Sequence, residues 1–115
     1  MSLKDKIKAA IDIESEVVEV PEWGVTVEVR TISGARRAEI FSRASDEKGN
    51  IQAADAYIAL IIAAAHDPET GETIFTKDDI TWLKEKSAKA TERLATVAAR
   101  LAGIGPEALK VAEKN

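Results

Sequence analysis

The sequence predicts an α+β fold in which an N-terminal β-hairpin packs on a bundle of four or five helices. Apolar residues alternate with polar ones between Ile13 and Arg30, and ten consecutive apolar residues run from Ala56 to Ala65. From Ile80 onward, apolar residues recur every three or four positions. Alternation is typical of strands buried on one face, whereas the two later patterns are typical of buried and amphipathic helices.

The whole chain, residues 1–115, is expected to form a single domain. Twenty of its 115 residues are alanine, so a second core would lack large apolar side chains. The absence of cysteine excludes disulfides, thiolate catalysis and cysteine-based zinc sites. Residues 1–11 are rich in lysine and are expected either to fray or to form a short helix.

The hairpin is predicted from two β-rich runs on either side of a Pro/Gly loop, residues 21–24. In the second run Val25, Val27 and Val29 share one face. Val18 and Val20 are out of phase with Val17, which leaves a bulge or a register change open. Because a hairpin alone is marginally stable, the valine face must pack on helices or on another chain.

Two helices are expected next. The first runs from about Ser33 to Lys48, with Gly49 as its stop. The second runs from Ile51 to about His66, with Asn50 as its N-cap. This second helix is apolar on all sides, so either its own domain or a partner chain must bury it. His66, the single histidine, is interpreted as a cap of the helix C-terminus rather than a ligand.

The composition of residues 67–72 predicts a turn, and residues 73–75 can form a third short strand. Thr76 then begins a capping box, which predicts a helix from Lys77. The apolar stripe that follows fits one long helix over 77–102 or two helices that meet near Ser87. We favour the break, because small residues weaken the middle of the stripe. Gly103 is expected to end this segment, and a last short helix is expected from Pro106.

No motif in the chain predicts catalysis, a metal site or a cofactor. Glycine-rich phosphate loops and nucleophile elbows are absent from the sequence, so we expect no enzyme activity and no cofactor. A net charge of −4 argues against nucleic acid as the main partner. No apolar run reaches the roughly 20 residues that span a bilayer, so we expect no membrane partner and read the chain as a soluble intracellular domain.

Protein partners are the remaining class, and three features are candidates for binding them. Four arginines, Arg30, Arg36, Arg37 and Arg43, form a local cluster of positive charge, and residues 12–28 form an acidic stretch. These are either solvated zones of opposite charge or a docking site for a charged partner. The tryptophans and the late apolar stripe are either core or an interface. The candidate partner-binding residues are Trp23, Arg30, Arg36, Arg37, Trp82, Leu94, Val97 and Leu101.

Four segments taken in order resemble a known family. They are residues 23–32 (WGVTVEVRTI), 67–83 (DPETGETIFTKDDITWL), 86–87 (KS) and 100–103 (RLAG). Their order and spacing resemble the tail assembly chaperones of long-tailed bacteriophages and prophages over about residues 15–115.

The resemblance implies a non-enzymatic protein of the host bacterial cytoplasm. Such chaperones bind the long, hydrophobic, helical tape measure protein, keep it soluble and help recruit tail tube subunits. Apolar surface kept for a client also favours self-association, so we expect homo-oligomers. Three alternatives stay open: a small structural tail or connector component that remains in the particle, an unrelated enzyme, and a small adaptor of cellular origin.

Overall fold

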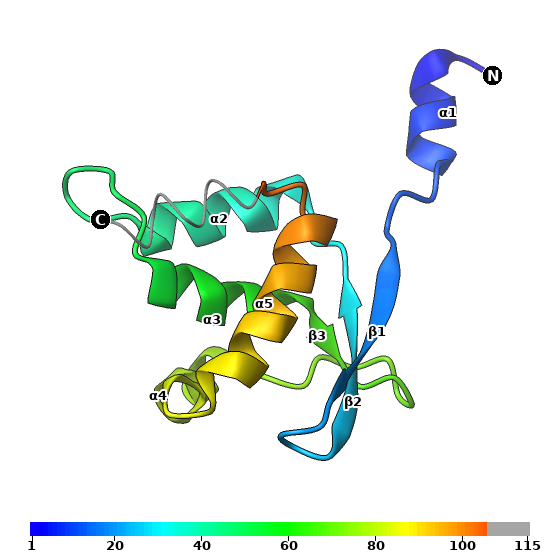
Figure 1. Cartoon of the computed structure of the whole chain (residues 1–115). Coiled ribbons are helices and arrows are strands. Elements are labelled where there is room, and N and C mark those ends of the chain that lie inside the picture. The colour runs from blue at the N-terminus through cyan, green and yellow to red at the C-terminus, as the bar shows by residue number, and fades with distance from the viewer. Residues whose placement is uncertain (106–115) are drawn as a thin grey trace.

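The computed structural model describes residues 1–105 and confirms the mixed α+β fold with an N-terminal hairpin (Figure 1). The expected helix from Pro106 lies outside the described residues. In chain order the elements are α1 (Leu3–Ala9), β1 (Ser15–Val20), β2 (Val25–Arg30), α2 (Gly34–Ala44), α3 (Ala53–Ala64), β3 (Ala65–His66), the 3-10 helix η1 (Lys77–Asp79), α4 (Ile80–Lys84) and α5 (Ala88–Leu101).

The hairpin has an uninterrupted antiparallel register from the Ser15–Arg30 pair to the Val20–Val25 pair. No bulge interrupts it, so the phase change at Val17 has another cause. Val17 simply points away from the core and is 60% exposed. The valines that face the core are Val18, Val20, Val27 and Val29.

The third strand is not where the sequence placed it. It is Ala65–His66, which directly follows α3 and pairs with β2, whereas Thr73 makes only an isolated bridge to His66. Helix α3 ends two residues earlier than expected because Ala65 adopts an extended backbone and pairs with Val29. Pairing with a strand distant in sequence thus decided where the helix ends.

The connection between α2 and α3 also differs from the prediction. Helix α2 ends at Ala44, not Lys48, and residues 46–50 form a turn in which the Asp46 carboxylate accepts the backbone N–H groups of Lys48 and Asn50. Gly49 serves this turn with a φ of 84° instead of ending the helix. Asn50 is not an N-cap, because α3 begins only at Ala53.

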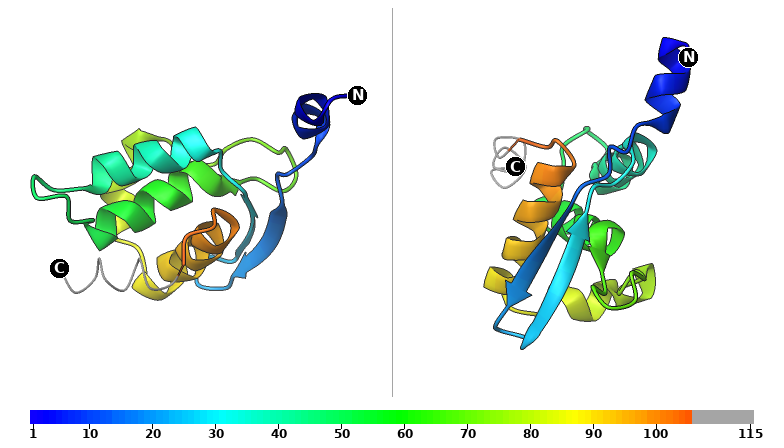
Figure 2. Two further views of the ribbon diagram at one scale, coloured as in Figure 1. Left: turned by 90° about the horizontal axis from the view of Figure 1, so that it is seen from above. Right: turned by 90° about the vertical axis from the view of Figure 1, so that its right-hand side faces the viewer.

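Helix α3 is the centre of the core, so its own domain buries this helix that is apolar on all sides. It contacts α2, α4 and α5, and α5 in turn contacts β1 and β2, so α5 joins the helices to the sheet (Figures 1 and 2). The buried residues of α3 are Ala56, Ile58, Leu60, Ile61, Ile62 and Ala64.

The structure confirms the helix break near Ser87. Ser87 caps α5, and its hydroxyl accepts the backbone N–H of Ala90 at 3.3 Å. The Thr76 capping box is also present, with the Asp79 carboxylate accepting the N–H of Thr76 at 2.8 Å. Each helical segment thus begins at its own N-cap, Thr76 before η1 and α4 and Ser87 before α5, so the apolar stripe does not form one long helix.

At the N-terminus, the structure has the short helix that was one of two expected alternatives, but α1 contributes nothing to the core. It extends away from the rest of the fold, and none of its residues is buried (Figures 1 and 2). Among residues 1–105, no helix is both long enough and apolar enough to cross a membrane.

Candidate functional site

A groove between α2, α3 and α4 is a concave surface that can hold a partner. Helix α3 forms its floor, with α2 on one side and η1 and α4 on the other. Its volume is about 220 Å³. The lining residues are Arg36, Glu39, Ile40, Arg43, Ala44, Asp55, Ile58, Ala59, Ile62, Lys77, Ile80 and Lys84.

The groove has an apolar floor because each helix presents one face to it. On α3, Ile58, Ala59 and Ile62 are spaced by one and three positions, which places them on one side of the helix. Ala59 is only partly buried, and Ile80 on the α4 side remains 36% exposed. Ile58 and Ile62 are themselves buried, so the apolar surface that the fold leaves uncovered in the groove comes from Ala59 and Ile80.

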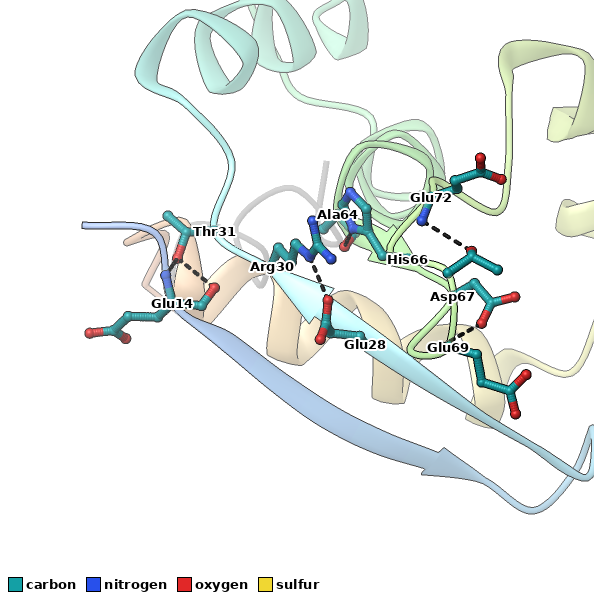
Figure 3. Close-up of polar contacts among 10 residues, drawn as sticks. Glu14, Glu28, Arg30, Thr31, Ala64, His66, Asp67, Glu69 and Glu72 are labelled. Atoms are coloured by element: carbon teal, nitrogen blue, oxygen red, sulfur yellow. Dashed lines mark hydrogen bonds and ion pairs between the residues drawn. The ribbon is translucent and has the colours of Figure 1, made fainter. Parts of the chain in front are cut away.

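The fold divides the predicted arginine cluster and keeps only two of its members together. Arg30 pairs with Glu28 on its own strand, as Figure 3 shows, whereas Arg36 and Arg43 both pair with Glu39 on α2. Arg37 donates from Nη1 to the carbonyl of Ala102 at 2.8 Å. Only Arg36 and Arg43 reach the groove.

Arg37 has a structural partner that the sequence analysis did not anticipate. Ala102 follows the last turn of α5, where free carbonyls carry partial negative charge. The Arg37 guanidinium therefore stabilises the C-terminal end of α5, although Ala102 is 65 residues away in the chain.

The acidic stretch 12–28 meets its opposite charge within the chain. Arg93 on α5 makes a bidentate ion pair with Glu22, and Arg100 on α5 pairs with Glu16 on β1. The hydrogen bonds from Arg93 are the main cause that lowers the pKa of Glu22 from 4.5 to about 2. These two pairs bind the hairpin to α5, so this part of the acidic zone is already partnered.

The two tryptophans are each associated with Phe75, Trp82 through a ring contact and Trp23 through a shared hollow. The rings of Phe75 and Trp82 meet edge to face, 5.8 Å between centroids. The Trp82 Nε1 donates to Asp79 at 2.9 Å, and the hydrogen bonds from Thr76 and Trp82 lower the pKa of Asp79. Trp23 is partly buried against the core, beside a second hollow that Phe75 also lines. Trp82, at 44% exposure, keeps more surface for a partner.

The three candidate residues on α5 do not form a shared free stripe. Leu94 is 1% exposed and belongs to the core, whereas Val97 and Leu101 are partly buried at its margin. Alanines occupy the centre of the buried face instead, namely Ala90, Ala95, Ala98 and Ala99. In this monomer Leu94 is therefore not accessible to a partner.

His66 and the turn after it have structural roles. The His66 Nδ1 bonds the carbonyl of Ala64, the last residue of α3, at 2.8 Å (Figure 3). Asp67 accepts the N–H of Glu69 at 2.8 Å, which closes the predicted turn. In the described part of the chain, no three His, Asp or Glu side chains are grouped to hold a metal ion.

Sequence reasoning missed most of the groove, although one signal was present. Lys77, Ile80 and Lys84 are spaced by three and four positions, which puts two cations beside an apolar residue on one helical face. No local pattern connects them with Ala59 or Arg43, because only packing brings the three helices together.

Comparison with known proteins finds a similar structure. The chain is similar to the tail assembly chaperone of bacteriophage HK97, with a TM-score of 0.61 and 25% sequence identity, covering 86% of this chain and 91% of that one. No protein-family model matches the chain, and no curated protein matches it. The likeness therefore rests on a shared fold across nearly the whole of both chains.

Proposed function

We propose that this protein is a phage tail assembly chaperone that binds the tape measure protein of its phage and keeps it soluble. In this role it also helps to recruit tail tube subunits, acts in the host bacterial cytoplasm and performs no catalysis. The observation that carries the proposal is the fold similarity to the HK97 tail assembly chaperone over most of both chains.

The surface of the molecule supports a binding role. A client that is long, helical and apolar needs a groove with uncovered apolar surface, and the groove over α3 offers such surface at Ala59 and Ile80. Exposed apolar residues outside it, such as Ile7 on α1 and Trp82 on α4, add contact area for a client or for further copies of the chain. We accordingly propose that the protein forms homo-oligomers, which sedimentation velocity tests directly.

Co-expression tests the client. The tape measure protein from the same genome is produced with and without this chain, and its soluble yield and co-purification are measured. We expect a clear rise in soluble tape measure protein and a stable complex. An acidic protein of similar size serves as the control, since net negative charge alone must not produce the effect. Equal yields with the two proteins would contradict the proposal.

The alternative is a small structural component of the tail or connector. Mass spectrometry of purified particles separates the two functions, because a chaperone is absent from the finished particle whereas a structural component is present in fixed copy number. Detection at a fixed stoichiometry would replace the chaperone proposal.

A further inference from the structure

The groove over α3 differs in charge from the rest of the protein. The whole chain carries a net charge of −4. The rim of the groove has the opposite balance, because it contains four cations and only two carboxylates. The cations are Arg36, Arg43, Lys77 and Lys84, and the carboxylates are Glu39 and Asp55.

Ion pairing within the rim leaves positive charge over. Glu39 is shared by Arg36 at 3.2 Å and Arg43 at 3.1 Å, so one carboxylate faces two guanidinium groups. Asp55 pairs with Lys84 at 2.9 Å. Within residues 1–105, Lys77 has no ion-pair partner, and it lies exposed on the α4 side of the groove. One unmatched cation therefore remains on each side of the apolar floor.

The floor is shaped for an apolar ridge. Ala59 lies between Ile58 and Ile62 and has a small side chain, which allows another backbone to approach α3 closely. A cavity of about 150 Å³ accommodates a benzene molecule, so a groove of about 220 Å³ admits large aliphatic side chains.

We infer that this groove binds an amphipathic helix whose apolar stripe has acidic residues on both sides. The apolar stripe lies on Ala59 and its neighbours, while the acidic flanks meet Arg43 on one side and Lys77 on the other. This inference rests on the proposed function, because it names the kind of tape measure segment that the chaperone holds. Opposite rim charges favour the acidic helix and disfavour basic ones, which is how charge selects partners at interfaces.

Two peptides test the inference against the full-length protein. Both are helices of about 18 residues with the same leucine stripe, long enough to hold helical structure. One has glutamate at the flanking positions and the other has lysine. We expect the glutamate peptide to bind about tenfold more tightly by isothermal titration calorimetry, with an advantage that shrinks at high salt. Equal affinity of the two peptides would overturn the inference.

Variants locate the binding site. Lys77→Glu, alone and together with Arg43→Glu, is expected to weaken binding of the glutamate peptide, and the double variant is expected to favour the lysine peptide. Both positions are exposed, and an acidic residue suits the first turn of η1. Arg43→Glu gives up the pair with Glu39 at a modest cost in helix stability, so circular dichroism and thermal unfolding verify that each variant is folded at the assay temperature. Lys8→Glu on the distant α1 is the matched control. Unchanged affinity in the groove variants, or an equal loss in the control, would place the peptide elsewhere.

A second copy of the chain is the competing occupant. Sedimentation velocity of wild type and the double variant decides between them, because a change in oligomer mass would show that the groove holds another protomer and would overturn the inference. The proposed function fails separately: it is lost if wild-type protein leaves the tape measure protein insoluble. If the groove variants still solubilise that client, the chaperone proposal stands and the groove inference falls.

Discussion

Gly103 shows how one residue closes the α5 end of the fold. Its φ of 75° lies in the left-handed region, and the N–H of Ile104 then bonds back to the carbonyl of Ala99 at 2.8 Å. This is a glycine-dependent helix end, and it returns Ile104 to the core at 7% exposure. Arg37 binds the adjacent Ala102 carbonyl, so backbone conformation and charge end the helix together.

Gly103→Ala is therefore expected to destabilise the protein by about 1–2 kcal/mol, because an L-residue in the left-handed region places its Cβ against its own backbone. Urea denaturation measures the change in free energy of unfolding. Gly34→Ala is the matched control: Gly34 is the first residue of α2, has open space around it and has no positive φ. Comparable losses in the two variants would show that the φ of Gly103 is not what matters.

At the scale of elements, α5 packs differently from the stripe that its spacing outlined. The three-and-four spacing linked Leu94, Val97 and Leu101 as equals, but the helix is rotated so that small alanines and Leu94 face α3 and the sheet. The alanines permit α5 to approach α3 closely. Leu101 then lies at the margin of the core, where it is only partly buried.

The same leucine-to-alanine substitution at two positions of α5 tests which side of the helix faces the core. Leu94→Ala is expected to cost about 3 kcal/mol of unfolding free energy, since it leaves a cavity in a closely packed core. Leu101→Ala removes the same atoms from a partly exposed site and is expected to cost clearly less. Thermal and urea unfolding of both variants checks the order. Equal losses would mean that Leu101 is as deeply packed as Leu94.

At the scale of the whole molecule, ion pairs join segments far apart in the sequence. Glu22 and Arg93 are 71 residues apart, and Glu16 and Arg100 are 84 apart. Together with the buried valines, they hold the hairpin against α5. The depressed pKa of Glu22 shows that the folded state favours its charged form.

This depression predicts how acid acts on stability. The pKa of Glu22 is about 2 in the folded state against an ordinary 4.5, so the pair stabilises the fold fully above about pH 4.5 and is lost as the pH falls toward 2. Glu22→Gln should reduce the loss of stability over this range, measured by urea unfolding at a series of pH values. Glu19→Gln, an exposed β1 residue with no ion pair in residues 1–105, is the control and should behave as wild type. A wild-type acid response in Glu22→Gln would exclude the pair as its source.

The sequence determined the features that depend on near neighbours. Alternating valines around a Pro/Gly loop specified the hairpin, ten apolar residues specified the central helix, and Thr76, Ser87 and Gly103 each marked a helix boundary. The helix-boundary signals act within five residues, and the hairpin and the central helix each depend on one continuous stretch of chain, so the sequence alone carries them.

Only the tertiary structure decided the features that depend on distant partners. Pairing with β2 turned Ala65–His66 into a strand, and packing rotated α5 onto its alanines. A hydrogen bond to the distant Ala102 carbonyl drew Arg37 out of the arginine cluster and to the end of α5. The groove has the same origin, because α2, α3 and α4 meet there from separate parts of the chain. Burial and pairing energies between segments outweigh local preferences at these points, and a one-dimensional pattern does not contain them.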